Sequence, residues 1–214
     1  MKKILVIGAG GHSRVLQDII NEIGGYQVTA ILDDKFQFKE SREGVYFGPI
    51  SMLNDLVAEF DCKIIVAIGQ NEMRLKVISQ LKLHADRYET VIHPTAIVSK
   101  DVSIGQGTVI MANVVVNTGS KIGSHVILNT SAVIDHDALI DDYAHIAPNA
   151  TLTGAVTVGV GSLIGAGSTV LPTTAIGQWS IIGAGSTVIK NVSSNITVAG
   201  SPARIIRKGR VSCG

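Results

Sequence analysis

The chain has 214 residues, a formal charge of +1 and 46% hydrophobic residues, yet only 4% aromatic residues. Such a small charge provides no field to attract nucleic acid or an anionic membrane, and Cys62 and Cys213 fit neither a disulfide framework nor a metal site, which predicts two reduced thiols. The N-terminal apolar run is shorter than a signal peptide requires, and no stretch approaches the roughly 18 residues of a spanning helix, so we predict a cytoplasmic protein.

The N-terminal half alternates strand-like and helix-like apolar patterns, which is typical of a parallel α/β domain. The expected strands are Ile4–Ile7, Val28–Leu32, Ile64–Ile68 and Thr90–Ile92, and the expected helices are Ser13–Ile23, Met52–Phe60 and Asn71–Leu83.

A glycine-rich turn, GAGGHS at residues 8–13, joins the first strand to the first helix. Backbone N–H groups at such a turn can hold a phosphate. Ser13 replaces the third glycine of a dinucleotide fingerprint, and the domain is small for a whole dinucleotide, so a mononucleotide or a sugar attached to one is the predicted ligand. Asp33 and Asp34 end the second strand, where carboxylates can accept hydrogen bonds from ribose or a base. Alternatively, they cap a turn.

The second half carries a repeat of six residues. Ile, Leu or Val occupies every sixth position from Ile92 to Val188, and a small or β-branched residue follows four positions later. This period excludes a 3.6-residue helix and suits short strands joined by turns, with those two positions inside and the others outside. Glycine follows the aliphatic residue where we expect sharp turns, at Gly105, Gly123, Gly159, Gly165, Gly177 and Gly183.

This pattern resembles the hexapeptide repeat of the left-handed parallel β-helix acyltransferases, in which three hexads make one triangular coil. Placed on such a coil, His125, His136, Asp137 and His145 point outward. Because a β-helix has no internal cavity, chemistry is expected on its outer face or between subunits.

The whole chain resembles the UDP-4-amino-sugar N-acetyltransferases of bacillosamine-type biosynthesis and their sialic-acid O-acetyltransferase relatives. The matching stretches are GAGGH (8–12), LDD (32–34), AIGQNEMR (67–74), ILNTSAVIDHDALI (127–140), AHIAP (144–148) and AGSPAR (199–204). The resemblance implies a Rossmann-like nucleotide-sugar-binding domain (1–90), a left-handed β-helix domain (91–192) and a C-terminal tail (193–214). It also implies acetyl-CoA as co-substrate, no metal, and a homotrimer.

The family's functional residues map onto particular positions of this chain. His136 matches the catalytic base, and Asp137 matches an adjacent acid that is usually Glu. If the shorter Asp137 does not reach the ring, Asp135 or a carboxylate of a partner subunit would replace it. The remaining matches are with acetyl-CoA contacts (His145, Gly154, Ala166, Ala184) and with nucleotide-sugar contacts (Gly10, Gly11, His12, Asp33, Asp34, Gly69).

Several alternatives stay open at this stage. His136 can be an ordinary surface histidine, His145 an interface residue, and His12 only the start of a helix. The acceptor can be a sialic acid or another sugar, and a structural trimer that binds nucleotide sugars without catalysis is a further alternative. A zinc-dependent carbonic anhydrase would need His125, His136 and His145 to meet, which their spacing does not favour. The basic residues Arg204, Arg207 and Lys208 either meet CoA phosphates or are solvated.

Overall fold

The computed structural model describes residues 1–208 and divides the chain into two compact units, Met1–Pro94 and Thr95–Gly214. Residues 209–214, which include Cys213, lie outside the described residues. In residues 1–208, no helix combines the length and apolar character needed to cross a membrane.

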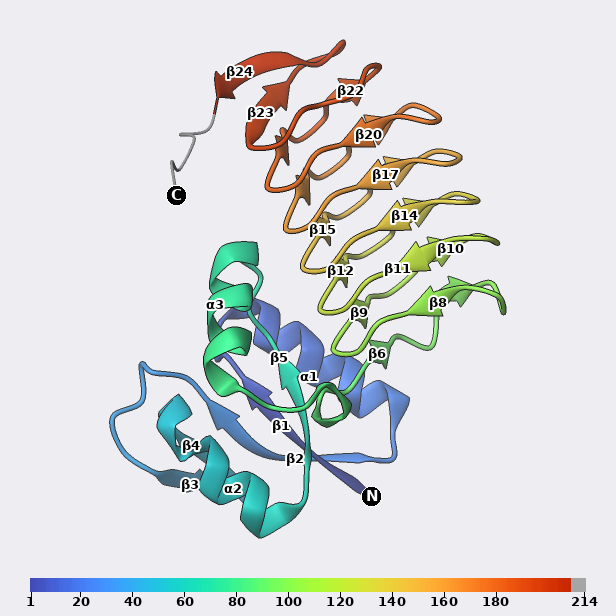
Figure 1. The fold of residues 1–214 in the computed structure, drawn as a ribbon. Helices are drawn as coiled ribbons and strands as arrows, with labels where there is room; N and C mark the ends of the chain where they lie inside the picture. The colour runs from blue at the N-terminus through green and yellow to red at the C-terminus, as the bar shows by residue number, and fades with distance from the viewer. Residues whose placement is uncertain (209–214) are drawn as a thin grey trace. The chain divides into compact units, whose positions relative to one another are not determined.

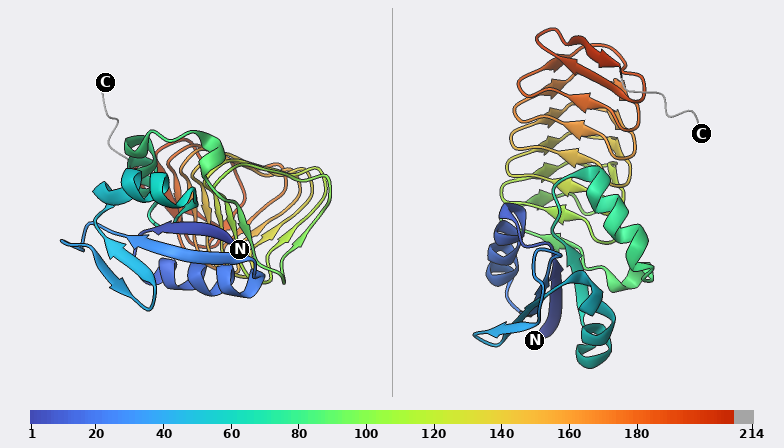
Figure 2. Two further views of the ribbon diagram at one scale, coloured as in Figure 1. Left: turned by 90° about the horizontal axis from the view of Figure 1, so that it is seen from below. Right: turned by 90° about the vertical axis from the view of Figure 1, so that its left-hand side faces the viewer.

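The first unit is a three-layer α/β fold, as predicted. Its five-stranded sheet has the order β3-β4-β2-β1-β5, and α1 covers one face while α2 and α3 cover the other (Figure 2). The strands are β1 (Lys2–Ile7), β2 (Tyr26–Leu32), β3 (Glu40–Arg42), β4 (Val45–Gly48) and β5 (Lys63–Val66). The helices are α1 (Gly11–Ile23), η1 (Ile50–Met52), α2 (Leu53–Phe60), α3 (Asn71–Leu81) and η2 (Ala85–Arg87).

Two features of this unit differ from the sequence predictions. The expected strand Thr90–Ile92 forms only β6 (Val91–Ile92), which is not part of the five-stranded sheet. The antiparallel pair β3–β4 was not predicted; it closes through Glu43 and Gly44, both at positive φ (51° and 82°). Positive φ at both central residues is typical of a tight hairpin turn, so this dipeptide was the available signal.

The second unit is the predicted left-handed parallel β-helix (Figure 1). From Ile97 to Val170, each two-residue strand pairs in parallel with the strand 18 residues further on, as Val133 does with Thr151. The first sheet contains β7 (Ile97–Val98), β10 (Val115–Val116), β13 (Val133–Ile134), β16 (Thr151–Leu152), β19 (Thr169–Val170) and β22 (Thr187–Val188). The second contains β8 (Ser103–Ile104), β11 (Lys121–Ile122), β14 (Leu139–Ile140), β17 (Thr157–Val158) and β20 (Ala175–Ile176).

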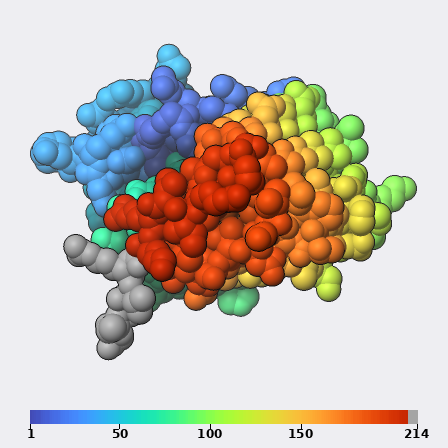
Figure 3. All heavy atoms as spheres, turned by 90° about the horizontal axis from the view of Figure 1, so that it is seen from above, coloured from blue at the N-terminus to red at the C-terminus, as the bar shows by residue number. Residues whose placement is uncertain are grey.

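The third sheet continues into the segment that sequence analysis treated as a tail. Within the second unit it contains β9 (Val109–Ile110), β12 (Ile127–Leu128), β15 (His145–Ile146), β18 (Leu163–Ile164), β21 (Ile181–Ile182), β23 (Ile196–Ala199) and β24 (Arg204–Lys208). β24 runs antiparallel to β23. From above, these last residues (red) lie over the preceding coils (Figure 3). Residues 196–208 are therefore largely regular structure.

The interior of the β-helix follows the predicted pattern. The aliphatic residues from Ile110 to Val188 are buried, as are the small residues from Thr108 to Ser186 that follow four positions after each repeat residue. The exceptions lie at the start of the series: Ile92, which is 37% exposed, and the half-buried Ala96, Val98, Val102 and Ile104. The repeat therefore determines which side chains remain outside.

The glycines that follow the aliphatic residues have little room for a Cβ, but they do not make the sharp turns of the coil. They do not have positive φ. Instead, a Cβ on Gly105 would lie 2.5 Å from the backbone carbonyl carbon of Gly123 in the next coil, so these glycines permit close stacking of coils. The sharp turns lie two positions later, where residues from Gly107 to Gly185 all have φ between +55° and +75°. His125 occupies such a corner and is buried rather than pointing into solvent, because its ring stacks on Tyr143 at a centroid distance of 5.4 Å.

Candidate functional site

A pocket of about 550 Å³ lies in the first unit at the carboxyl ends of its central strands. β1 and β5 are neighbours, but the helices that follow them cover opposite faces of the sheet, which makes this the topological switch point where α/β sheets bind ligands. The lining residues are Gly8, Ala9, Gly10, Gly11, His12, Asp33, Asp34, Ile50, Ala67, Ile68, Gly69, Gln70, Met73 and Val77. All six positions that the resemblance matched to nucleotide-sugar contacts therefore lie in one pocket.

The floor of this pocket depends on Gly8, the first residue after β1. Its φ is +105°, and a Cβ there would lie 2.7 Å from the carbonyl oxygen of Ala67, which follows β5. Only glycine fits this approach without strain. The turn then continues to Gly10 and Gly11 at the start of α1, where a Cβ would meet nothing within 4 Å. Gly10 and Gly11 are exposed and line the pocket, so the start of the helix borders it.

Asp33 and Asp34 hold the loops around the pocket as well as line it. Asp33 Oδ2 accepts a hydrogen bond from the N–H of Ala9 at 2.7 Å, and Asp33 Oδ1 accepts one from the N–H of Lys35 at 3.0 Å. Asp34 Oδ1 accepts one from the N–H of Ile50 at 3.1 Å. The turn-capping interpretation is therefore correct for both carboxylates, and both still line the pocket.

His12 brings a neutral imidazole to the same pocket. Its Nε2 atom is buried without a hydrogen-bond partner in the described chain. Burial and then the positive charge of Arg74 lower the pKa of His12 to about 4. The ring is therefore uncharged near neutral pH, and Nε2 can donate to or accept from a ligand, depending on the tautomer.

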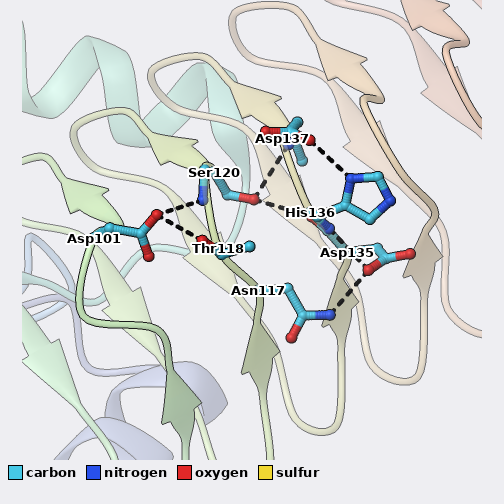
Figure 4. Close-up of polar contacts among 9 residues, drawn as sticks. Asp101, Asn117, Thr118, Ser120, Asp135, His136 and Asp137 are labelled. Carbon is cyan, nitrogen blue, oxygen red and sulfur yellow. Dashed lines mark hydrogen bonds and ion pairs between the residues drawn. The ribbon is translucent and has the colours of Figure 1, made fainter.

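The second candidate site lies at a corner of the β-helix, directly after β13 (Figure 4). Nδ1 of His136 lies 2.8 Å from Oδ2 of Asp137, so the shorter aspartate does reach the ring. Asp137 has φ of 59°, one of the left-handed corner residues. Both side chains are more than half exposed, at 56% for His136 and 66% for Asp137.

Two further side chains fix the backbone at this corner. Asp135 Oδ1 accepts hydrogen bonds from the N–H of His136 at 2.8 Å and from Nδ2 of Asn117, one coil earlier, at 2.9 Å. The buried hydroxyl of Ser120 donates to the carbonyl of Asp135 at 2.9 Å and accepts from the N–H of Ala138 at 3.2 Å. The segment that carries His136 is therefore tied to the preceding coil on both sides.

Glycines on the neighbouring coils make room for the pair. A Cβ on Gly154, one coil after His136, would lie 2.6 Å from both Cε1 and Nε2 of the imidazole. A Cβ on Gly119, one coil before Asp137, would collide with the Asp137 carboxylate. Gly154 therefore contacts the histidine ring itself, in the position that the resemblance matched to acetyl-CoA.

The carboxylates at this corner favour the protonated imidazole. The hydrogen bond to Asp137 contributes most to raising the pKa of His136, and the negative charge of Asp135 contributes next. Conversely, the hydrogen bond from Asn117 and that from the His136 N–H lower the pKa of Asp135. His136 can therefore accept a proton more readily than an isolated histidine, and the resulting charge is stabilised in place.

The other positions matched to acetyl-CoA lie away from the His136 corner, in or just after strands of the third sheet. His145 in β15 is half-buried, and its Nε2 lies 3.1 Å from Nδ2 of Asn129. Ala166 and Ala184 are exposed, and the N–H of Gly185 bonds to the carbonyl of Ala166, which places the two alanines on adjacent coils at one corner. The structure thus pairs His136 with Asp137 and Gly154, and pairs Ala166 with Ala184.

Two of the remaining histidines also pair with carboxylates, but neither pair lies on the β-helix. His93 Nε2 pairs with Glu22 at 2.9 Å, and exposed His84 pairs with Asp86 at 2.8 Å. Cys62 is buried, and burial raises the pKa of its thiol. Across residues 1–208, no three His, Cys, Asp or Glu side chains converge to hold a metal ion.

The sequence and the two units define the class of protein. A model of the PglD N-terminal domain matches residues 3–81. UDP-N-acetylbacillosamine N-acetyltransferase of Bacillus subtilis (strain 168) is 44% identical over 113 residues, which cover 52% of each chain, so the match spans about half of that relative. GDP-perosamine N-acetyltransferase of Escherichia coli O157:H7 is 31% identical over 97% of both chains.

Solved structures extend this likeness over both units. PerB from Caulobacter crescentus, in complex with CoA and GDP-perosamine, has a TM-score of 0.87, 33% identity and coverage of 97% of this chain and 98% of that one. The acetyltransferase domain of PglB from Neisseria gonorrhoeae FA1090, in complex with acetyl coenzyme A, has a TM-score of 0.87, 37% identity and coverage of 96% and 99%. The chain belongs to this family of nucleotide-sugar N-acetyltransferases, which confirms the resemblance that its sequence indicated.

Two residues that shape the sites were missed by sequence analysis. Arg74 lies within the quoted AIGQNEMR stretch but resembles a surface residue of an amphipathic helix. Asn117 lies 18 residues before Asp135, and its role follows only from the stacking of coils.

Proposed function

We propose that the protein transfers the acetyl group of acetyl-CoA to the 4-amino group of a UDP-linked amino sugar, with His136 as general base. The observation that carries this proposal is the His136–Asp137 pair on a rigid corner, with Gly154 beside the reactive nitrogen. We prefer UDP over GDP because the Bacillus subtilis relative, which has the higher identity of the two named relatives, is named for a UDP sugar. The alternative acceptors are a GDP-linked amino sugar and a sialic-acid hydroxyl.

The chemistry follows from the state of the imidazole. When Nδ1–H donates its hydrogen bond to Oδ2 of Asp137, Nε2 carries the lone pair. The neutral amine attacks the thioester carbonyl carbon, forming the new C–N bond, and Nε2 takes a proton from the nitrogen as it becomes positively charged. The C–S bond then breaks, and the CoA thiolate leaves and takes up the proton that Nε2 received, which restores the neutral imidazole. Asp137 and Asp135 stabilise the imidazolium during this step.

The other positions complete the proposed reaction. Gly10, Gly11, His12, Asp33, Asp34 and Gly69 bind the nucleotide part of the acceptor, and His145, Gly154, Ala166 and Ala184 contact acetyl-CoA. Because side chains fill the interior of the β-helix, acetyl-CoA must lie on its outside, and a homotrimer supplies neighbouring surfaces for it. We place the reaction in the cytoplasm, in bacterial glycan biosynthesis.

Release of free thiol from acetyl-CoA tests this proposal. The acceptors are a panel of UDP-4-amino sugars, GDP-perosamine and sialic acids, each measured with wild-type protein and with His136→Ala. We expect turnover with a UDP-4-amino sugar that depends on His136. Activity on sialic acids alone would reject the acceptor class, and absence of turnover with every acceptor would favour a structural role.

A further inference from the structure

Arg74, in the first turn of α3, is buried, although a charged residue on an amphipathic helix is expected at the surface. Its side chain is 1% exposed, which makes it the largest side chain among the fully buried ones. Arginine is rarely buried to this degree unless its guanidinium has a defined set of partners. Arg74 therefore needs an explanation beyond the amphipathic pattern of its helix.

The guanidinium binds the turn that joins β5 to α3. Its Nη1 donates to the carbonyl oxygens of Ile68 at 3.0 Å and of Gly69 at 3.2 Å. Its Nη2 donates to Oδ1 of Asn71, the first residue of α3, at 3.0 Å. One planar group thus fixes two successive peptide units and the start of a helix.

The orientation of those peptide units determines what the pocket presents to a ligand. In a trans peptide the C=O and the following N–H point in opposite directions. Since the carbonyls of Ile68 and Gly69 point toward Arg74, the N–H groups of Gly69 and Gln70 point away from it. Gly69 and Gln70 both line the pocket at the switch point of the sheet.

We propose that Arg74 is a positioning residue for phosphate binding: it holds the turn 68–70 so that the N–H groups of Gly69 and Gln70 donate to the diphosphate of the nucleotide sugar. This inference rests on the proposed function, because it takes the nucleotide sugar as the ligand. The diphosphate then accepts hydrogen bonds from two N–H groups of this turn and from those at the start of α1, at Gly10 and Gly11.

Arg74 also affects the histidine in the same pocket. Its positive charge adds to burial in lowering the pKa of His12. The carboxylates of Asp33 and Asp34, which follow β2, are the acidic groups that line the same pocket. Without the guanidinium charge, the pKa of His12 should therefore rise from about 4.

Two substitutions separate these effects. Arg74→Lys keeps the positive charge but loses the planar fork, and Arg74→Met loses both. We expect both variants to bind UDP about ten-fold more weakly by titration calorimetry, as for the loss of one to two charge-assisted hydrogen bonds. Only Arg74→Met should raise the pKa of His12, followed by NMR of the imidazole signals. Uridine, which has no phosphate, should bind all three proteins about equally weakly.

Kinetics and a stability control complete the test. The KM for the sugar nucleotide should rise with little change in kcat or in the KM for acetyl-CoA. Leu16→Ala, in the core of α1 and away from the pocket lining, should lower stability without changing the ratio of UDP to uridine affinity. Equal losses of UDP and uridine affinity, or wild-type UDP affinity in Arg74→Met, would overturn the role of Arg74 alone. If the wild-type protein itself does not bind UDP, the proposed nucleotide class fails, and this inference fails with it.

Discussion

The two units hold their site residues by different physical means. In the β-helix, His136, Asp137 and Gly154 are neighbours because successive coils stack in register, and residues 18 apart must meet. In the α/β unit, the pocket residues come from turns after three strands, and individual hydrogen bonds from Asp33, Asp34 and Arg74 keep those turns in place. A repeat positions a site through its register, whereas an α/β sheet needs dedicated residues in its loops.

Replacing His136 should have the largest effect on activity, while the register of the coils and the loops of the α/β unit stay unchanged. For His136→Ala we expect kcat to fall about 10² to 10⁴-fold, because general-base catalysis is lost. The KM values should change little, since the coil does not depend on the ring. Thiol release from acetyl-CoA measures both. The matched control is His84→Ala, because His84 forms another exposed His–Asp pair with the same separation of 2.8 Å. Similar losses in both variants would contradict a catalytic role.

The dependence of the pocket on single loop residues can be tested at Gly8. Gly8→Ala combines positive φ with a Cβ 2.7 Å from a carbonyl oxygen, so it should destabilise the α/β unit by about 1–3 kcal/mol and weaken UDP binding. Hydrogen exchange should show faster exchange in residues 1–94 and unchanged exchange in the β-helix. Gly24→Ala is the control, because its φ is +70° but a Cβ there has open space. If both variants behave alike, the close approach to Ala67 is not the cause.

The corresponding test in the β-helix is Gly154→Ala. The φ of Gly154 is not positive, so the substitution adds only a Cβ 2.6 Å from the His136 ring. Displacing the base by up to about 1 Å should lower kcat roughly ten- to hundred-fold with little change in stability. In Gly107→Ala a Cβ would collide with the ring of His125 at a different corner, so stability should fall while kcat persists. Full activity in Gly154→Ala would show that the ring does not need this space.

The β-helix could be predicted from the sequence because its period leaves few alternatives. A six-residue repeat fits neither a helix nor a long strand, and each strand from β9 to β22 coincides with a repeat position. The corner conformation was not predictable in this way. Trp179 and Thr173 adopt positive φ (56° and 59°) although their residue types disfavour it, because stacked coils impose the turn.

The sequence indicated which residues form the candidate sites, but not the distances and contacts between them. Whether Asp137 reaches His136 depended on its left-handed backbone, which brings the carboxylate to 2.8 Å from the ring. In the α/β unit, the glycine-rich turn after the first strand and the acids after the second indicated part of the pocket wall, whereas Gly69 was assigned only through the family resemblance. The buried Arg74 was missed because helical periodicity cannot distinguish an arginine at the surface from one bound to backbone carbonyls behind a turn.

The smallest expected effect concerns Asp137, whose replacement changes the pH profile more distinctively than the rate. The base works only when neutral, so kcat/KM should fall as the pH drops through the pKa of His136, which Asp137 raises. In Asp137→Asn the pKa of His136 should decrease, and the acidic limb of kcat/KM should move to lower pH. The rate above that limb should fall about ten-fold, because the imidazolium loses a charged hydrogen-bond partner.

Asn suits this test because it tolerates the left-handed conformation at φ 59°, so the corner should keep its shape. Asp142→Asn is the control: Oδ1 of Asp142 accepts a hydrogen bond from the N–H of Ser124 at 2.7 Å on another edge of the coil, away from His136. Its acidic limb should stay in place. If the limb also stays in place in Asp137→Asn, then Asp135, whose charge is the next contributor to the raised pKa, supports the base instead. The repeat would then have fixed the catalytic pair through the residue before the histidine rather than through the one after it.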